Sequence, residues 1–170
     1  TPSMIYTQLK TVPRWHHWTT PALFLALSLG GGGLLAGQVN LAIALLLGAG
    51  MLQAFVWVSG DSRFARSGSD MQTATGLGHI GKVRSFAPPH TGSNYLMREF
   101  IYVVGRKHAQ KLQALALIFG FVAPVILLLV PFSHIFAALA VLCHIAGVLI
   151  LRWLFFAQAE HVVGLYYGAR

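Results

Sequence analysis

The chain has 170 residues, of which 56% are hydrophobic and 9% are charged, and its formal net charge is +8. Because a soluble domain carries about a quarter charged residues, this composition argues against a soluble enzyme and indicates a membrane protein. The single cysteine, Cys143, excludes an internal disulfide, a thiolate zinc site and a cysteine-ligated iron–sulfur cluster within the chain.

The N-terminal segment is polar and ends in a pattern typical of a membrane boundary. TPSMIYTQLKTVPRW has no basic region followed by an apolar run, so we expect no cleavable signal peptide, and the missing initiator Met predicts a processed or truncated product. In RWHHWTTP, Trp15 and Trp18 suit the level of the lipid headgroups, Thr20 can cap a helix and Pro21 is tolerated at a first helical position.

Two apolar blocks, at 21–58 and 112–156, are each too long for one membrane span. The first would measure about 57 Å as a single helix, whereas a bilayer core is about 30 Å thick. Turn residues divide the blocks at GQVN and at VPFSH. A soluble bundle of all-apolar helices is the alternative. We predict an all-α integral membrane protein, a single domain over 1–170 with four transmembrane helices at about 21–37, 41–58, 112–131 and 135–157, and a long loop at 59–111.

Glycine and proline residues inside these spans predict local features. Gly33 and Gly37 form a small-xxx-small pair, which favours close helix packing over a backbone opening for a ligand. Pro124 should kink the third helix.

The basic residues predict the orientation. Four spans place the N-terminal segment, the loop at 59–111 and the C-terminal tail on one face. All 12 Lys and Arg residues lie there or at the inner end of the last helix: Lys10, Arg14, Arg63, Arg66, Lys82, Arg84, Arg98, Arg106, Lys107, Lys111, Arg152 and Arg170. Basic residues in short loops mark the cytoplasmic side, so we expect both termini and the long loop in the cytoplasm of a bacterial inner membrane. Membrane topology thus explains the charge, and no nucleic-acid partner is expected.

The loop contains GLGHIGKVRSFAPPHTGSNYLMREF, whose first glycines have the G-x-G-x-x-G spacing of a dinucleotide-binding turn. That turn needs a buried strand before it and a helix starting at the glycines. Polar residues precede these glycines, and paired prolines follow, so the dinucleotide interpretation is excluded. After the prolines, Ser93 or Asn94 can cap an amphipathic helix that lies on the membrane.

Polar residues in the last span are the candidates for chemistry. The first three spans have no interior histidine, so a haem with two histidine ligands is not expected, and His144 is interpreted as a packing residue hydrogen-bonded to a neighbouring helix. Arg152 either snorkels to the headgroups or lines a polar pocket with Glu160 and His161. Such a pocket would suit a quinone headgroup, because these groups can hydrogen-bond its carbonyls and exchange protons. No metal site is expected.

Several motifs together carry a family resemblance. LKTVPRWHHWTTP, the glycine-containing loop with RKHAQKL, and RWLFFAQAEHVVGLYYG resemble the membrane-anchor subunit of the dimethyl sulfoxide reductase family, and the long loop is closest to anchors of cytoplasm-facing sulfite dehydrogenases. The resemblance covers nearly all of this chain, but only the C-terminal half of the family's eight-span anchors. Arg152, Phe155 and Phe156 match the family's Arg-x-x-Phe-aromatic pattern.

The resemblance implies a function. Such an anchor holds a molybdopterin catalytic subunit and an iron–sulfur subunit on the membrane, and exchanges electrons with quinone without a haem or metal of its own. The loop would dock the iron–sulfur subunit, through glycines that permit close approach and basic residues that meet an acidic surface: Gly76, Gly78, His79, Gly81, Lys82, Arg84, His90 and Arg98. A basic loop beside anionic lipid is the alternative. A non-redox scaffold or assembly protein and a haem-containing cytochrome b-type subunit are the alternative functions.

Overall fold

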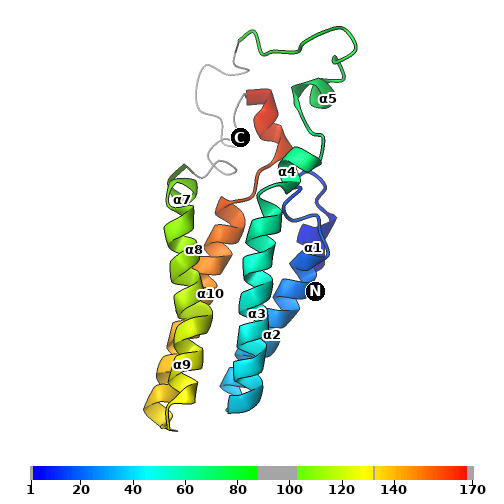
Figure 1. Ribbon diagram of the computed structural model, residues 1–170. Coiled ribbons are helices and arrows are strands. Elements are labelled where there is room, and N and C mark those ends of the chain that lie inside the picture. Colours follow the sequence, from blue (N-terminus) through cyan, green and yellow to red (C-terminus); the bar gives the residue numbers. More distant parts are fainter. Residues whose placement is uncertain (1, 88–102, 132, 168–170) are drawn as a thin grey trace.

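The computed structural model describes residues 2–87, 103–131 and 133–167, and every regular element in these ranges is a helix (Figure 1). The long elements are α2 (Thr19–Leu35), α3 (Val39–Gly60), a continuous third helix made of α8 (Ala109–Leu117), the π-helix η1 (Ile118–Val122) and α9 (Ala123–Leu129), and α10 (His134–Ala157). The short elements are α1 (Pro2–Gln8), α4 (Arg63–Arg66), α5 (Met71–Thr75), α7 (Val103–Lys107) and the 3₁₀-helix η2 (Val162–Tyr167).

The long helices form a bundle, and three of them are long and apolar enough to cross a membrane. These are α3, the continuous helix from Ala109 to Leu129, and α10, whereas α2 is an apolar helix of 17 residues. All four predicted helices are present, and their observed ends differ from the predicted ends by at most three residues. The predicted amphipathic helix after the paired prolines lies outside the described residues, except for the final turn, α7.

Gly37 ends α2, and the predicted Gly33–Gly37 packing pair is therefore wrong in one member. Gly37 has a φ of +68°, and its N–H and that of Gln38 donate to the carbonyl oxygens of Leu34 and Gly33 at 3.2 and 3.1 Å. This is a Schellman cap, for which glycine is favoured because a left-handed residue without a Cβ is not strained.

Gly33 does pack against α3, and Gly30, one turn earlier in α2, packs against α3 as well. A Cβ on Gly33 would lie 3.7 Å from the Ala42 backbone, and one on Gly30 would lie 3.3 Å from the Leu46 side chain. Ala42 and Leu46 are fully buried. The packing interpretation of the glycine-rich run is thus confirmed, with the contact shifted one turn towards the helix start.

Pro124 produces a π-helical turn in the third helix. Proline has no N–H to donate to the carbonyl oxygen four residues earlier, and its ring crowds that oxygen, so the chain widens into η1. The carbonyl four residues before Pro124 is that of Gly120, and His144 Nδ1 donates to it at 2.7 Å. The interpretation of His144 as a buried residue hydrogen-bonded to a neighbouring helix is confirmed.

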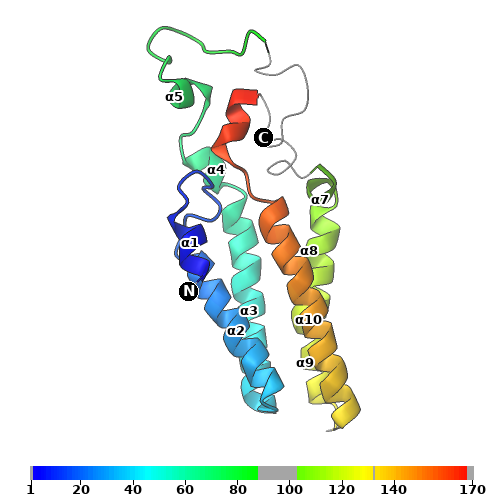
Figure 2. The same ribbon diagram turned by 180° about the vertical axis from the view of Figure 1, so that it is seen from behind.

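The N-terminal segment, the start of the long loop and the C-terminal tail gather at one end of the bundle (Figures 1 and 2). The Val162 N–H donates to the Thr11 carbonyl oxygen at 3.0 Å, and the Tyr166 hydroxyl donates to the Ala74 carbonyl oxygen at 2.6 Å. Trp15 stacks on Phe155 with ring centroids 4.9 Å apart. These contacts confirm that the three segments share one face.

Arg63 connects three segments at this end of the bundle by hydrogen bonds. The side chain is 9% exposed and donates hydrogen bonds to the Arg14 carbonyl, the Thr19 hydroxyl and the Ser59 hydroxyl, at 3.0, 3.1 and 2.7 Å. One side chain therefore joins the N-terminal segment, the start of α2 and the end of α3.

Replacing Arg63 with methionine is expected to lower the free energy of unfolding by about 2 kcal/mol, because three hydrogen bonds from a charged donor are lost together. Thermal unfolding of the purified protein in mild detergent measures this loss. Arg84→Met is the matched control, since Arg84 is exposed on the loop. Equal unfolding temperatures for the two variants would contradict the connecting role of Arg63.

Candidate functional site

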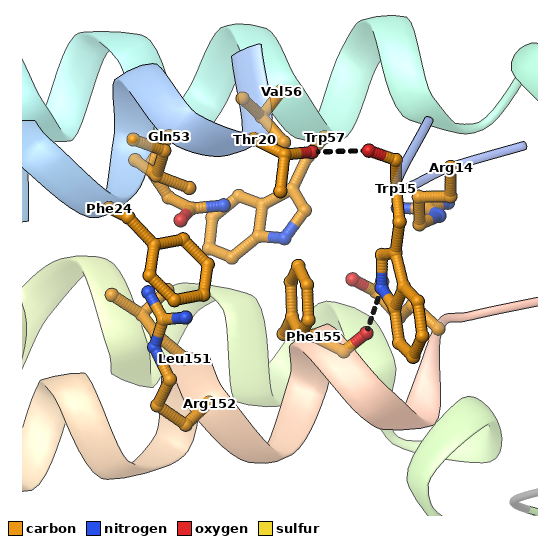
Figure 3. Close-up of a pocket in the computed structure, with 12 residues that line it drawn as sticks. Arg14, Trp15, Thr20, Phe24, Gln53, Val56, Trp57, Leu151, Arg152 and Phe155 are labelled. Atoms are coloured by element: carbon orange, nitrogen blue, oxygen red, sulfur yellow. Dashed lines mark hydrogen bonds between the residues drawn. The ribbon is translucent and has the colours of Figure 1, made fainter. Parts of the chain in front are cut away.

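Arg152 lies on α10, near the C-terminal end of that helix, and its side chain reaches across to α2 (Figure 3). The guanidinium carbon is 4.0 Å from the ring centroid of Phe24 and 5.5 Å from that of Phe155. Cation–π contacts of this kind stabilise a charge away from water. Arg152 forms no ion pair with a carboxylate of the described residues, so its charge is held by aromatic rings and remains available to a ligand.

Arg152 lines two cavities, and the inner one is small. It lies between α2, α3 and α10, has a volume of about 30 Å³ and is drawn in Figure 3. Gln53 contributes a buried amide from the middle of an otherwise apolar stretch of α3. Arg14 and Gln158 line the same cavity. The volume is enough for a water molecule or two, and the polar lining provides partners for them.

The second cavity has a volume of about 380 Å³ and lies between α2 and α10; we call it the α2–α10 cavity. Its walls are mainly apolar, and the side chains of Ile145 and Leu149 in its lining are exposed on the outer surface of the bundle. The polar groups in the lining are Ser28, His144 and Arg152. An apolar cavity with a few polar groups is the usual form of a small-molecule site.

The hydrogen bond of His144 fixes which ring nitrogen is available. A carbonyl oxygen only accepts, so Nδ1 carries the proton that binds Gly120, and in the neutral ring Nε2 is left as an acceptor. Nε2 faces Gly31 of α2, where an added Cβ would lie only 3.2 Å away. Glycine at this position therefore leaves room beside Nε2.

Neither Glu160 nor His161 belongs to the lining of the two described cavities that Arg152 lines. The prediction of one pocket assumed that helical spacing continues past Arg152, but α10 ends at Ala157 and the following residues leave the helical path. The negative charge of Glu160 acts instead on Arg106, whose guanidinium donates to the carbonyl oxygens of Ala157 and Ala159 at 3.0 and 2.9 Å.

His161 lies in the segment between α10 and η2. Its Nδ1 accepts a hydrogen bond from the Val163 N–H at 3.0 Å, and burial lowers its pKa below the ordinary value of 6.5. Burial also lowers the pKa of His17, which the charge of Arg63 lowers further. Both imidazoles therefore favour the neutral form at neutral pH.

These pKa shifts predict a loss of stability on acidification. Below the unfolded-state pKa, the unfolded chain binds protons that the folded protein does not, so stability falls as pH drops through 6.5 towards the lowered values. Replacing His17 and His161 together with glutamine is expected to flatten the fall in unfolding temperature between about pH 7.5 and pH 5.5. Replacement of His79, which is exposed on the loop, is the control. An unchanged slope in the double variant would contradict the assignment.

The proposed docking residues that the structure describes lie on an exposed loop. Gly76 caps α5 in the left-handed conformation, with a φ of +70°, and His79 Nδ1 donates to the Gly76 carbonyl oxygen at 3.1 Å. Gly78, Gly81, Lys82 and Arg84 are exposed, whereas His90 and Arg98 lie outside the described residues. A five-residue helix precedes the glycines and irregular backbone follows them, which agrees with exclusion of a dinucleotide turn.

Sequence reasoning missed three polar residues: Gln53 and Ser28, which line the cavities of Arg152, and Arg63, which joins α2 to α3. Gln53 had a usable signal, because an amide inside an apolar span is costly unless it has polar partners or lines a polar space. Arg63 was considered only as one of the basic residues that mark the cytoplasmic side. Its buried position depends on a contact with Thr19, 44 residues earlier.

A comparison with characterised proteins shows a relative over nearly the whole chain. The chain is 29% identical over 182 aligned residues to a subunit of the sulfite dehydrogenase of Allochromatium vinosum, covering 97% of this chain and 55% of that protein. This similarity supports a sulfite dehydrogenase-like anchor family. The chain spans about half the length of that relative. No family model and no solved structure matches the chain.

Proposed function

We propose that this chain is the membrane anchor of a molybdenum- and iron–sulfur-containing oxidoreductase complex and passes electrons between the iron–sulfur subunit and membrane quinone. The similarity to a sulfite dehydrogenase subunit along 97% of the chain supports the anchor role. The complex would lie in a bacterial inner membrane, with the long loop and both termini in the cytoplasm. Basic residues concentrated at one end of the bundle support that orientation.

In this proposal the chain contributes four membrane crossings, made by α2, α3, the continuous third helix and α10. The 17 residues of α2 measure about 26 Å, close to the thickness of a bilayer core of about 30 Å. It also runs beside α3, connected by the short turn at Gly37, so the two helices cover the same depth. The packing of α2 along α3 supports this crossing.

The observation that carries the quinone proposal is Arg152 in the α2–α10 cavity. The volume of about 380 Å³ lies within the range of roughly 300–1,000 Å³ typical of small-molecule sites. Arg152 can donate to a quinone carbonyl, Nε2 of His144 can accept from a quinol hydroxyl, and the apolar walls suit an isoprenoid tail. The opening beside Ile145 and Leu149 would admit a ligand from the lipid.

Proton exchange needs a route between this cavity and the cytoplasm. Arg152, Gln53 and Arg14 line the small inner cavity, and a water molecule or two there would form part of such a route. Glu160 and His161 lie beyond it, in the segment after α10, and are proposed to take up or release the protons. This chain would supply no metal or haem, because the electrons arrive from clusters in the partner.

The exposed loop that begins at Gly76 is proposed to meet the iron–sulfur subunit. Lys82 and Arg84 are exposed there, and neither forms an ion pair with a carboxylate of the described residues. An acidic partner surface would complement this charge and speed docking.

Purification through a tag on the natural full-length protein, in gentle detergent, tests this function. Mass spectrometry should identify a molybdopterin subunit and a cysteine-rich iron–sulfur subunit in the same complex. Recovery of the protein alone, from a preparation that keeps other respiratory complexes intact, would favour the scaffold function. A haem absorbance band assigned to this subunit would favour the cytochrome b-type function.

A further inference from the structure

A second large cavity lies at the basic end of the bundle, and Arg152 is not part of its lining. It has a volume of about 670 Å³ and lies between the N-terminal segment, the end of α3, α4 and the residues after α4; we call it the basic cavity. Most side chains in its lining are basic, imidazole or hydroxyl groups: Lys10, His16, His17, Ser59, Arg63, Arg66, Ser67 and Ser69. Pro13 and Phe55 are the apolar members of the lining. No carboxylate of the described residues is part of this lining.

The cations that line the basic cavity, Lys10, Arg63 and Arg66, form no ion pair with a carboxylate of the described residues. Burial and the charges of Arg14 and Arg66 all lower the pKa of Arg63, which shows that cations are crowded here. The two nearest carboxylates in sequence are engaged elsewhere: Asp61 pairs with Arg14, and Asp70 accepts the Thr73 N–H at 2.7 Å as the cap of α5. The cavity is therefore built to receive an anion.

The basic cavity also has an apolar floor. Phe55 lies on α3 about 7.5 Å along the helix axis from Gly60, which is the last residue of that helix. Met51 and Leu47 continue the same exposed face of α3 below Phe55, at intervals of one helical turn. Polarity thus changes from cationic to apolar along one continuous surface.

We infer that the basic cavity binds an anionic phospholipid of the cytoplasmic leaflet. Its phosphate lies between Lys10 and Arg66 beside the Ser69 hydroxyl, and one acyl chain runs down α3 over Phe55. Basic pockets beside membrane helices on the cytoplasmic side suit anionic headgroups. Free phosphate shares the headgroup chemistry but leaves the Phe55 floor uncovered, and an acidic protein surface would have to enter the membrane to reach it.

The test uses the complete complex in nanodiscs of dioleoylphosphatidylcholine, with dioleoylphosphatidylglycerol added in steps. Native mass spectrometry should show one phosphatidylglycerol retained per anchor and thermal unfolding should shift upwards, while phosphatidylcholine is not retained. Each basic residue near a charged surface contributes about a fivefold factor in affinity, so Lys10→Ala with Arg66→Ala is expected to weaken retention roughly 30-fold. Arg63 is left in place because it connects three segments of the fold.

Lys107→Ala with Lys111→Ala is the matched control, because these exposed residues lie at the same end of the bundle but outside the basic cavity. Equal retention by the Lys10/Arg66 variant and the control would overturn the inference. Stabilisation by inorganic phosphate equal to that by phosphatidylglycerol would also overturn the inference. A third contrary result would be that the Lys10/Arg66 variant loses the partner subunit but retains phosphatidylglycerol as before. If the double variant does not assemble, the unsubstituted complex decides: equal retention of the two lipids rejects the site.

Discussion

Replacing Gly147 with alanine is expected to lower the free energy of unfolding by about 3 kcal/mol, because the added methyl group has no space. A Cβ at Gly147 would overlap the backbone N and Cα of Gly120 and lie 2.7 Å from the carbonyl carbon of Phe119. These are backbone atoms, so no side chain can rotate away. The two helices must separate, and separation also stretches the hydrogen bond from His144 to Gly120. Thermal unfolding and limited proteolysis in detergent measure the loss.

Gly32→Ala and Gly48→Ala are matched controls for this experiment. Both glycines lie inside apolar helices, and a Cβ at either would meet nothing within 4 Å. Alanine there should leave stability unchanged or raise it slightly, because alanine is the better helix former. If Gly147→Ala unfolds at the same temperature as these two variants, the close contact between the third helix and α10 is wrong.

Replacing Arg152 with leucine is expected to reduce quinone-linked turnover of the assembled complex about 100-fold. The guanidinium would stabilise the negative charge that builds on a quinone oxygen as electrons arrive, and removing one such donor from a site of low dielectric typically costs a factor of roughly 10²–10³. Arg152→Lys retains the charge but loses the planar stacking on Phe24, so we expect an intermediate rate. The measurement is steady-state oxidation or reduction of a short-chain quinone in membranes.

Two controls separate this effect from loss of the complex. Activity of the catalytic partner with a soluble dye must remain unchanged, which shows that assembly is intact. Trp153→Leu changes the neighbouring residue, which is 44% exposed and lines neither cavity of Arg152, and should leave turnover unaltered. Full quinone-linked activity in Arg152→Leu would reject the α2–α10 cavity as the quinone site while leaving the anchor role open.

Several features of the fold could be predicted because their causes are local. Long apolar runs interrupted by Gly, Asn and Pro specify helices and turns, and the predicted helix ends lie within three residues of the observed ones. The bond of His144 was predictable because an imidazole inside an apolar span needs a polar partner. Gly37 was misjudged because a glycine near a helix end satisfies both the packing pattern and the capping pattern.

The sequence by itself determined the membrane class, the helix positions and the face that carries the positive charge, because hydropathy and charge are properties of the residues alone. Only the tertiary structure decided what surrounds Arg152. Phe24 is 128 positions away along the chain, yet lies 4.0 Å from its guanidinium, whereas Glu160 is eight positions away and lines neither of its cavities. The reason is that helix packing brings distant residues together, while the end of α10 at Ala157 breaks the helical spacing that would have kept near neighbours on one side.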